Sequence, residues 1–189
     1  MEHIKTTETT ILLSEYRLQL KNKKETERTQ MEERKFKTTA ESRTEQTYVV
    51  RPANINGYGR LFGGQLMQWI DETAGFVSAR HCGTTVTTAS VDTLNFKAPA
   101  YANDMVVVIG RLTYVGRTSM EVRVDAYVEG HDGMRRNINT AYVVMVSIDD
   151  DGKALPVPGL KLQNMEEEAE WQAGQKRYEL RKQRRREGY

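Results

Sequence analysis

The stretch NGYGRLFGGQLMQWIDETAG, residues 56–75, contains residue types that could support chemistry. Gly63 and Gly64 open a segment whose apolar periodicity predicts a helix, and a helix N-terminus presents unpaired N–H groups with a partial positive charge. Glycines carry no Cβ, so a ligand atom could approach these amides closely. The same glycines could instead serve only a tight turn and close packing, and the residues alone leave both interpretations open.

Asp71 lies on the same predicted helix, which extends to about residue 80. It borders the apolar face, about 11 to 12 Å along the axis from Gly63. A half-buried carboxylate needs a partner or a chemical role, and a salt bridge or a hydrogen bond to a strand is the structural alternative. Its predicted stripe also holds Met67, Ala74 and Ser78, and a more polar stripe holds Gln65, Gln68 and Glu72.

Residues 47–160 contain most of the apolar content and are predicted to form one α+β domain. A short strand, TYVVRP, precedes the helix, and four strand-like runs follow it: TVTTASVDTLNF, DMVVVIGRLTYV, SMEVRVDAYVEG and INTAYVVMVSID. The third run alternates, with Met120 and Val122 on one face and Glu121 on the other, whereas the second and fourth are apolar on both faces, as expected for central strands or strands covered by a neighbouring subunit. We expect a four-stranded antiparallel meander.

Residues 1–46 are predicted to be a polar N-terminal extension. Apolar residues recur every fourth position at Leu12, Tyr16 and Leu20, which predicts a short amphipathic helix. The remainder is too polar to bury a core, so the segment is expected to be flexible or docked on a partner.

Residues 161–189 are predicted to form a charged C-terminal helix. Asn164 can cap it, glutamates fill its first turn and arginines fill its last, which suits the helix dipole. Trp171 and Tyr178, seven residues apart, form a thin docking stripe.

The composition favours a cytoplasmic protein that binds neither nucleic acid nor membrane. Lys and Arg number 28 against 26 Asp and Glu, so no bulk field attracts polyanions. The single cysteine, Cys82, excludes a disulfide framework. No secretory signal is present, and no apolar run approaches the roughly 20 residues that span a bilayer.

Metal and serine hydrolase chemistry are both disfavoured. No His/Cys cluster has metal-ligand spacing, and no GxSxG motif occurs. His81 follows the predicted helix, where the dipole favours a histidine for structural reasons, and His131 is expected in a solvated turn. We therefore predict no metal site.

Several blocks, in order, closely resemble the acyl-CoA thioesterase family with the hotdog fold, specifically its cytosolic acyl-CoA hydrolases and their short bacterial relatives. NGYGRLFGGQLMQWIDETAG is followed by ARH, TASVD, VGRTSMEV and PVPGL, and the resemblance covers about residues 43–180. It implies a long central helix wrapped by a curved antiparallel β-sheet. It also implies a homo-oligomer, commonly a homohexamer built as a trimer of dimers, with active sites at the dimer interface.

The resemblance implies an acyl-CoA hydrolase that needs no cofactor besides the CoA of its substrate. The amides of Gly63 and Gly64 would receive the developing oxyanion, and Asp71 would activate or orient water. Asn56, from the opposite subunit, would hold the water or the carbonyl, and loop capping is its alternative. The positions implied for CoA binding, including an arginine that reaches a phosphate, are Ala89, Ser90, Val91, Arg117, Thr118, Ser119, Met120 and Arg177.

Three other functions are weighed against hydrolysis. A hotdog hydratase or dehydratase usually needs a histidine over the substrate, and the predicted helix contains none. A non-catalytic acyl-CoA-binding module would have the same pocket and differ only in turnover. Nucleic-acid binding could use the run RKQRRR, but this run is confined to the C-terminal helix and has few aromatic neighbours.

Overall fold

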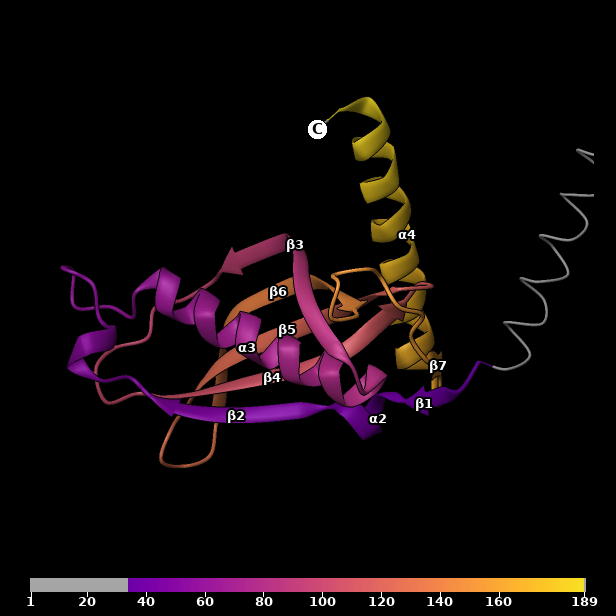
Figure 1. Cartoon of the computed structure of the whole chain (residues 1–189). Helices are drawn as coiled ribbons and strands as arrows, with labels where there is room; N and C mark the ends of the chain where they lie inside the picture. Colours follow the sequence, from indigo (N-terminus) through magenta and orange to yellow (C-terminus); the bar gives the residue numbers. More distant parts are fainter. Residues whose placement is uncertain (1–33, 189) are drawn as a thin grey trace, which may run out of the picture. The chain divides into compact units, whose positions relative to one another are not determined.

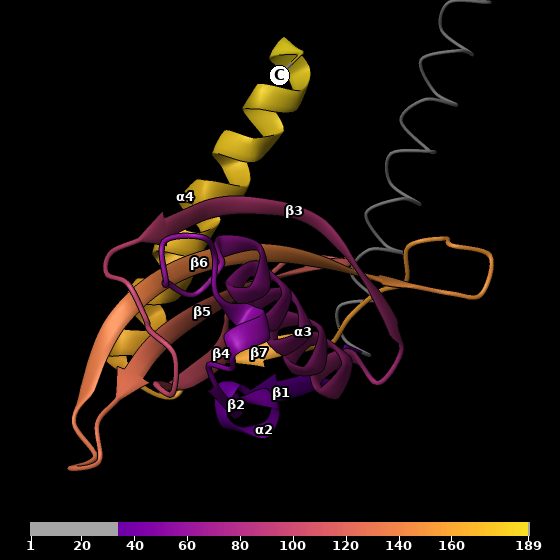
Figure 2. The same cartoon turned by 90° about the vertical axis from the view of Figure 1, so that its left-hand side faces the viewer.

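A curved five-stranded antiparallel sheet wraps around one long helix, α3 (Gly63–Cys82), in the computed structural model (Figures 1 and 2). The structure describes residues 34–188, so the helix predicted around Leu12–Leu20 lies outside the described residues. In spatial order the strands are β2 (Thr44–Val49), β4 (Met105–Val115), β5 (Ser119–Glu129), β6 (Arg135–Ile148) and β3 (Thr85–Phe96).

The predicted four-stranded meander is wrong in one pairing. β3 does not pair with β4, because β2 and β5 occupy the two edges of β4. Instead, residues 97–104 carry the chain across, and β3 pairs with β6 over Thr85↔Ile148 to Phe96↔Asn139. β3 is therefore an edge strand, and it lies beside α3 with one side unpaired within the described sheet.

α3 packs against the inner face of the sheet because its apolar residues recur at helical spacing. Leu66, Trp69 and Ile70 are buried, as are Ala74 and Val77 two turns later. The predicted inner face of β5 is confirmed, with its alternate apolar side chains in the same core. Burying each large apolar side chain contributes about 1.5–3 kcal/mol, so the position of α3 on the sheet is strongly determined.

A glycine on β4 lets α3 approach the sheet closely. A Cβ on Gly110 would lie 2.8 Å from Val77 Cγ2 and 2.9 Å from Thr73 Cγ2, which is closer than real contacts allow. At its far end the helix stops at Gly83, whose φ of 73° is left-handed and favours glycine.

The two ends of the domain are joined by a small parallel pair of strands. β1 (Phe36–Thr38) pairs with β7 (Gly159–Lys161), and α2 (Thr39–Ser42) connects β1 to β2. The predicted domain boundaries at residues 46 and 160 therefore fall inside β2 and β7. The fold begins within the segment predicted as an extension.

The predicted C-terminal helix is confirmed as α4 (Met165–Glu187), which lies on the opposite face of the sheet from α3 (Figure 2). Asn164 caps it by accepting a 2.9 Å hydrogen bond from the Glu167 N–H. Its docking stripe packs on β4, with the rings of Trp171 and Tyr178 centred 4.7 and 5.3 Å from that of Tyr114. Among the described helices, none is long and apolar enough to cross a membrane.

A buried carboxylate fixes α4 on the sheet. Glu121 of β5 has a side chain that is 0% exposed, and it accepts hydrogen bonds from Arg177 and Arg181 at 2.8 Å. Arg181 also bonds Asp92, at a β3 bulge. Gly174 permits this approach, because a Cβ there would lie 2.6 Å from Tyr114 Cβ.

We predict that Glu121→Ala lowers the free energy of unfolding by about 3 kcal/mol, because both arginines lose a buried partner. The measurement is urea unfolding at one fixed protein concentration. Glu179→Ala is the control, because Glu179 is 61% exposed and its ion pair with Lys182 is long, at 4.0 Å. The control should change stability by less than about 0.5 kcal/mol. Equal losses in the two variants would contradict a structural role for the Glu121 cluster.

Candidate active site

The N-terminus of α3 presents backbone N–H groups that the helix itself cannot pair. The short 3₁₀ turn Pro52–Asn54 and the loop after it lead into the helix, and the Phe62 N–H donates to the Asn54 carbonyl at 2.8 Å. The first turn closes when the Leu66 N–H donates to the Phe62 carbonyl at 3.1 Å. The amides of Gly63 and Gly64 precede this bond, so they are positioned to bind an acceptor oxygen.

Two phenyl rings pack against the glycine pair. A Cβ on Gly64 would lie 2.5 Å from Phe62 Cε1, and one on Gly63 would lie 3.4 Å from Phe96 Cζ. Phe62 and Phe96 are 57% and 55% exposed, so neither ring is fixed by the core. The glycines therefore serve close packing as well as access to the amides.

Asp71 pairs with a threonine on the edge strand. The Thr88 hydroxyl donates to Asp71 Oδ1 at 2.6 Å, a short charge-assisted hydrogen bond. Both side chains are exposed in the described chain, so the prediction of a half-buried Asp71 is wrong, although it does follow buried Ile70. The second Asp71 oxygen makes no hydrogen bond to a described residue and stays available to a ligand or water.

Asp71 lies in a cavity of about 270 Å³ between α3 and β3. Gly64, Gln68 and Val91 line it together with Asp71, and this space is called the Asp71 cavity below. One cavity thus combines a helix N-terminal residue with a carboxylate, which is the arrangement needed to polarise a carbonyl and handle a water.

A chain of hydrogen bonds holds the polar stripe of α3. Asn54 donates to Gln65 at 3.0 Å, Gln65 to Gln68 at 3.1 Å, and Gln68 to Glu72 at 2.8 Å. The Tyr48 hydroxyl is 3.4 Å from Glu72, and burial, followed by the Glu72 charge, raises the pKa of Tyr48 to about 12. Tyr48 is therefore neutral near pH 7 and is no candidate for a general base. The row of hydrogen bonds orients Gln68 in the Asp71 cavity.

Asn56 lies in a second cavity, of about 390 Å³, which Gly63 also lines and which is called the Asn56 cavity below. Its amide oxygen accepts from the N–H groups of Tyr58 at 2.9 Å and Arg60 at 3.3 Å, so Asn56 does cap its own loop. Its amide nitrogen makes no hydrogen bond to a described residue. The two predicted polar residues, Asn56 and Asp71, therefore line different cavities within one chain.

The predicted CoA-binding positions on β3 differ in their surroundings. Val91 lines the Asp71 cavity, and Ala89 is the extra residue of a bulge, between the pairs Thr88↔Met145 and Ser90↔Val144. The Ser90 hydroxyl is buried without a partner among the described residues. Met120 is 0% exposed in the core, so only its backbone could contact a ligand.

The predicted CoA-binding residues near α4 are already engaged with the protein. In the turn before β5, the carbonyls of Arg117 and Thr118 accept from the N–H groups of Val157 and Ser147. Arg177 bonds Glu121 and stacks 3.8 Å from the centre of the Tyr142 ring. Burial lowers the pKa of the Arg177 guanidinium, but its bonds to Glu121 outweigh this and raise it overall.

His81 and Cys82 have structural surroundings. His81 is 0% exposed, and its Nε2 lies 3.0 Å from the Pro158 carbonyl. The Cys82 sulfur accepts a hydrogen bond from the Thr84 hydroxyl at 3.0 Å. Within residues 34–188, no group of three histidine, cysteine, aspartate or glutamate side chains could hold a metal ion.

Thr88 is the site residue that the sequence reasoning missed. It begins the block TASVD, which carries part of the family resemblance, but that block was interpreted only through Ala89, Ser90 and Val91. Strand alternation could have indicated its face, because side chains two residues apart share one face of a strand.

Comparisons with known proteins point to one family. Residues 58–134 match the family model described as the thioesterase superfamily. The uncharacterized acyl-CoA thioester hydrolase YkhA of Bacillus subtilis is 38% identical over 128 residues, which cover 67% of this chain and 74% of that protein. The cytosolic acyl coenzyme A thioester hydrolase of Rattus norvegicus is 34% identical over 145 residues, covering 75% of this chain but only 38% of its own length.

Solved structures confirm the predicted hotdog fold. An apo-hexameric acyl-CoA thioesterase has a TM-score of 0.76 and 36% identity, over 79% of this chain and 97% of that one. The acyl-CoA hydrolase of Staphylococcus aureus, in complex with butyryl coenzyme A and coenzyme A, has a TM-score of 0.76 and 32% identity. The match covers 80% of this chain and 93% of that one. Variants of that hydrolase with an aspartate, an asparagine or a threonine changed to alanine also match.

We predict energetic coupling between Gly64 and the Phe62 ring. In a Phe62→Ala background, Gly64→Ala should stabilise the protein by about 0.5–1 kcal/mol through helix propensity, and clearly less when the Phe62 ring is present. Urea unfolding of the four proteins of the cycle measures the difference. Gly75→Ala is the matched control on α3, because its Cβ would meet nothing within 4 Å. Identical effects of Gly64→Ala in both backgrounds would show that the ring does not rest on Gly64.

Proposed function

We propose that this chain, which belongs to the thioesterase superfamily, hydrolyses acyl-CoA thioesters to a free carboxylic acid and CoA. The observation that carries the proposal is that Asp71, held by Thr88 at 2.6 Å, lines one cavity with Gly64 of the α3 N-terminus. In the Staphylococcus aureus hydrolase, three residues were changed to alanine in separate variants. The aspartate follows the asparagine by 15 residues, and the threonine follows the aspartate by 17. Asn56, Asp71 and Thr88 have the same separations here.

The proposed reaction adds one water to the thioester carbonyl. The N–H groups of Gly63 and Gly64 donate hydrogen bonds to the carbonyl oxygen as it becomes an oxyanion, and such a donor typically contributes about 3–4 kcal/mol. Asp71 takes a proton from the attacking water, and general-base catalysis of this kind typically raises the reaction rate by about 10²- to 10⁴-fold. The tetrahedral intermediate then collapses, the C–S bond breaks, and the CoA sulfur leaves and takes up the proton. No cofactor is needed.

Thr88 is proposed to aim the carboxylate of Asp71. Its hydroxyl occupies Asp71 Oδ1, so the other oxygen faces the water with a defined orientation. Thr88 is thus a positioning residue, and Asp71 is the group that contacts the reacting water.

The working unit is proposed to be a homo-oligomer, assembled as a trimer of hotdog dimers. β3 offers an unpaired edge to a second copy of the sheet, and edge strands left open in this way invite pairing. Two large apolar side chains that line the Asp71 cavity lie beside this edge, with Met67 44% and Val91 43% exposed. The match to an apo-hexameric thioesterase supports a hexamer, and the arrangement as three dimers is part of the proposal. Asn56 of one subunit would then complete a site containing Asp71 of the other.

CoA is proposed to run from the Asp71 cavity along β3 past Val91. The remaining predicted contacts, at Ala89, Ser90 and the Thr118–Ser119 turn, continue this path. Arg177 would reach a phosphate only after giving up part of its bonding with Glu121, so its contribution is the least supported part of the path.

We predict that Asp71→Asn lowers turnover at least about 100-fold, because the water loses its proton acceptor. The assay follows free thiol released from acyl-CoAs of short to long chain. Thr88→Val should lower turnover about tenfold and Thr88→Ser should restore it, since only the hydroxyl is needed. Thr87→Val is the control, because this exposed neighbour alternates to the other face of β3. Saturable CoA binding without turnover on any chain length would instead support a non-catalytic acyl-CoA-binding module.

We predict that two inactive variants complement each other. Purified Asn56→Ala and Asp71→Ala should each lose activity, whereas their co-expressed mixture should recover about one quarter of wild-type activity. This fraction follows because half of random dimers are mixed and each mixed dimer has one intact site. Light scattering establishes that all samples have the same mass. No recovery in mixed oligomers would contradict a site shared between subunits.

A further inference from the structure

The Asn56 cavity and the Asp71 cavity are lined by successive residues at the start of α3. Gly64 lines the Asp71 cavity and Gly63 lines the Asn56 cavity, and in the proposed dimer the Asn56 cavity of one subunit meets the Asp71 cavity of the other, so a carbonyl at this junction has access to both spaces. Val91, on the proposed path of CoA, lines only the Asp71 cavity. The Asn56 cavity therefore remains for the acyl group, and this assignment rests on the proposed function.

The Asn56 cavity has an apolar floor. Leu66, Ala100 and Ile138 line it and are 3%, 2% and 1% exposed. The Phe96 ring forms part of the wall beside Gly63. Such walls favour the methylene groups of an acyl chain, because burial removes them from water.

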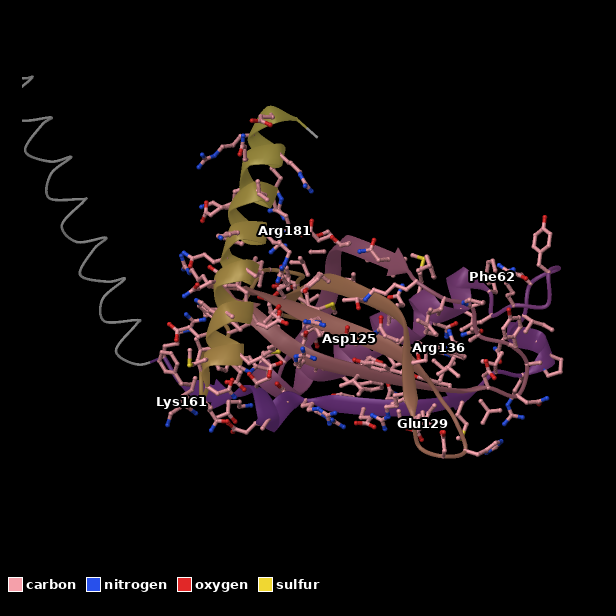
Figure 3. The ribbon with its side chains drawn as sticks, turned by 180° about the vertical axis from the view of Figure 1, so that it is seen from behind. Phe62, Asp125, Glu129, Arg136, Lys161 and Arg181 are labelled. Atoms are coloured by element: carbon pink, nitrogen blue, oxygen red, sulfur yellow. The ribbon has the colours of Figure 1, made fainter. Side chains whose placement is uncertain are left out.

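The charged side chains that line this cavity are all cationic. Two of the side chains that line it, Arg60 and Lys97, are cationic, and none is acidic. Arg136 lies next to the wall, where its Nη2 donates to the Pro99 carbonyl at 3.1 Å. Figure 3 places Arg136 and Phe62 at the same end of the sheet, away from α4.

These three cations lack acidic partners among the described residues, in contrast to most arginines of the sheet and of α4. Arg135 pairs with Glu45 and Glu129, and Arg123 pairs with Asp125. The Lys97 ammonium donates to the Thr140 hydroxyl at 2.9 Å, which leaves two of its three N–H donors. The Arg60 guanidinium has no hydrogen bond to a described side chain, so its five donors are available.

We propose that the Asn56 cavity takes an acyl chain that ends in a carboxylate, so that the preferred substrates are CoA thioesters of short dicarboxylic acids. The methylenes would lie against Leu66 and Ile138, and the terminal carboxylate would pair with Arg60, assisted by the field of Lys97 and Arg136. A guanidinium fork suits this partner, because it can bind a carboxylate with two parallel hydrogen bonds. The cavity volume of about 390 Å³ suits a short chain.

Chain-matched substrate pairs test this specificity. Glutaryl-CoA is compared with valeryl-CoA, and adipyl-CoA with hexanoyl-CoA, by kcat/KM from thiol release. The wild type should prefer each dicarboxylic thioester about tenfold. Arg60→Gln should remove this preference by slowing only the dicarboxylic substrates, and Arg60→Glu should invert it. Arg185→Gln, at an exposed position on α4, is the control and should keep the preference.

The alternative source of the anion is CoA itself. If Arg60 binds a CoA phosphate, Arg60→Gln will slow both members of each pair equally, and this result overturns the proposal. Equal rates on the two members in the wild type also overturn it. If no thioester is hydrolysed, the proposed hydrolase function is contradicted, but the proposed specificity is still testable. The affinities of the Asp71→Asn variant for the two members of a pair are then measured by calorimetry. Tighter binding of glutaryl-CoA than valeryl-CoA then supports the proposal, and equal binding overturns it.

Discussion

Burial of one face of α3 against the curved sheet is the constraint on which the rest of the structure depends. This packing forces β3 to the far edge of the sheet, beside the helix, and thereby brings Thr88 to Asp71. It also leaves the first turn of α3 at the end of the core, where the amides of Gly63 and Gly64 open onto two cavities. The site is therefore a consequence of how the helix ends and of which strand lies next to it.

The outer face of the sheet combines an aromatic contact with α4 and a cluster of buried charges. Glu121 is fully buried, and the arginines of α4 that surround it convert a costly buried charge into a docking point for the helix. This separates two groups of cations, because Arg177 and Arg181 pair with buried or nearly buried carboxylates and Arg60 has no acidic partner among the described residues. The unpaired group lies beside the cavity assigned to the acyl chain, and substrate charge is the property it would recognise.

Sequence reasoning predicted which elements exist and which faces they bury, because these depend on local periodicity. The alternation of β5 located its core face correctly, and the same alternation argues against a ligand role for the Met120 side chain. It could not predict the pairing of β3 with β6, because a two-residue period identifies faces but not neighbours. Thr88 with Asp71 and Arg177 with Glu121 are 17 and 56 residues apart, so only tertiary structure brings them together.

The central claim is that Asp71 handles water and does not attack the substrate itself. A single turnover in ¹⁸O-labelled water, with enzyme in excess over acyl-CoA, tests it by mass spectrometry of both the released acid and the protein. Direct attack of water predicts one ¹⁸O atom in the acid and none in Asp71. Label in Asp71 with an unlabelled acid would reveal an enzyme-bound anhydride and contradict the account, as would the absence of any turnover.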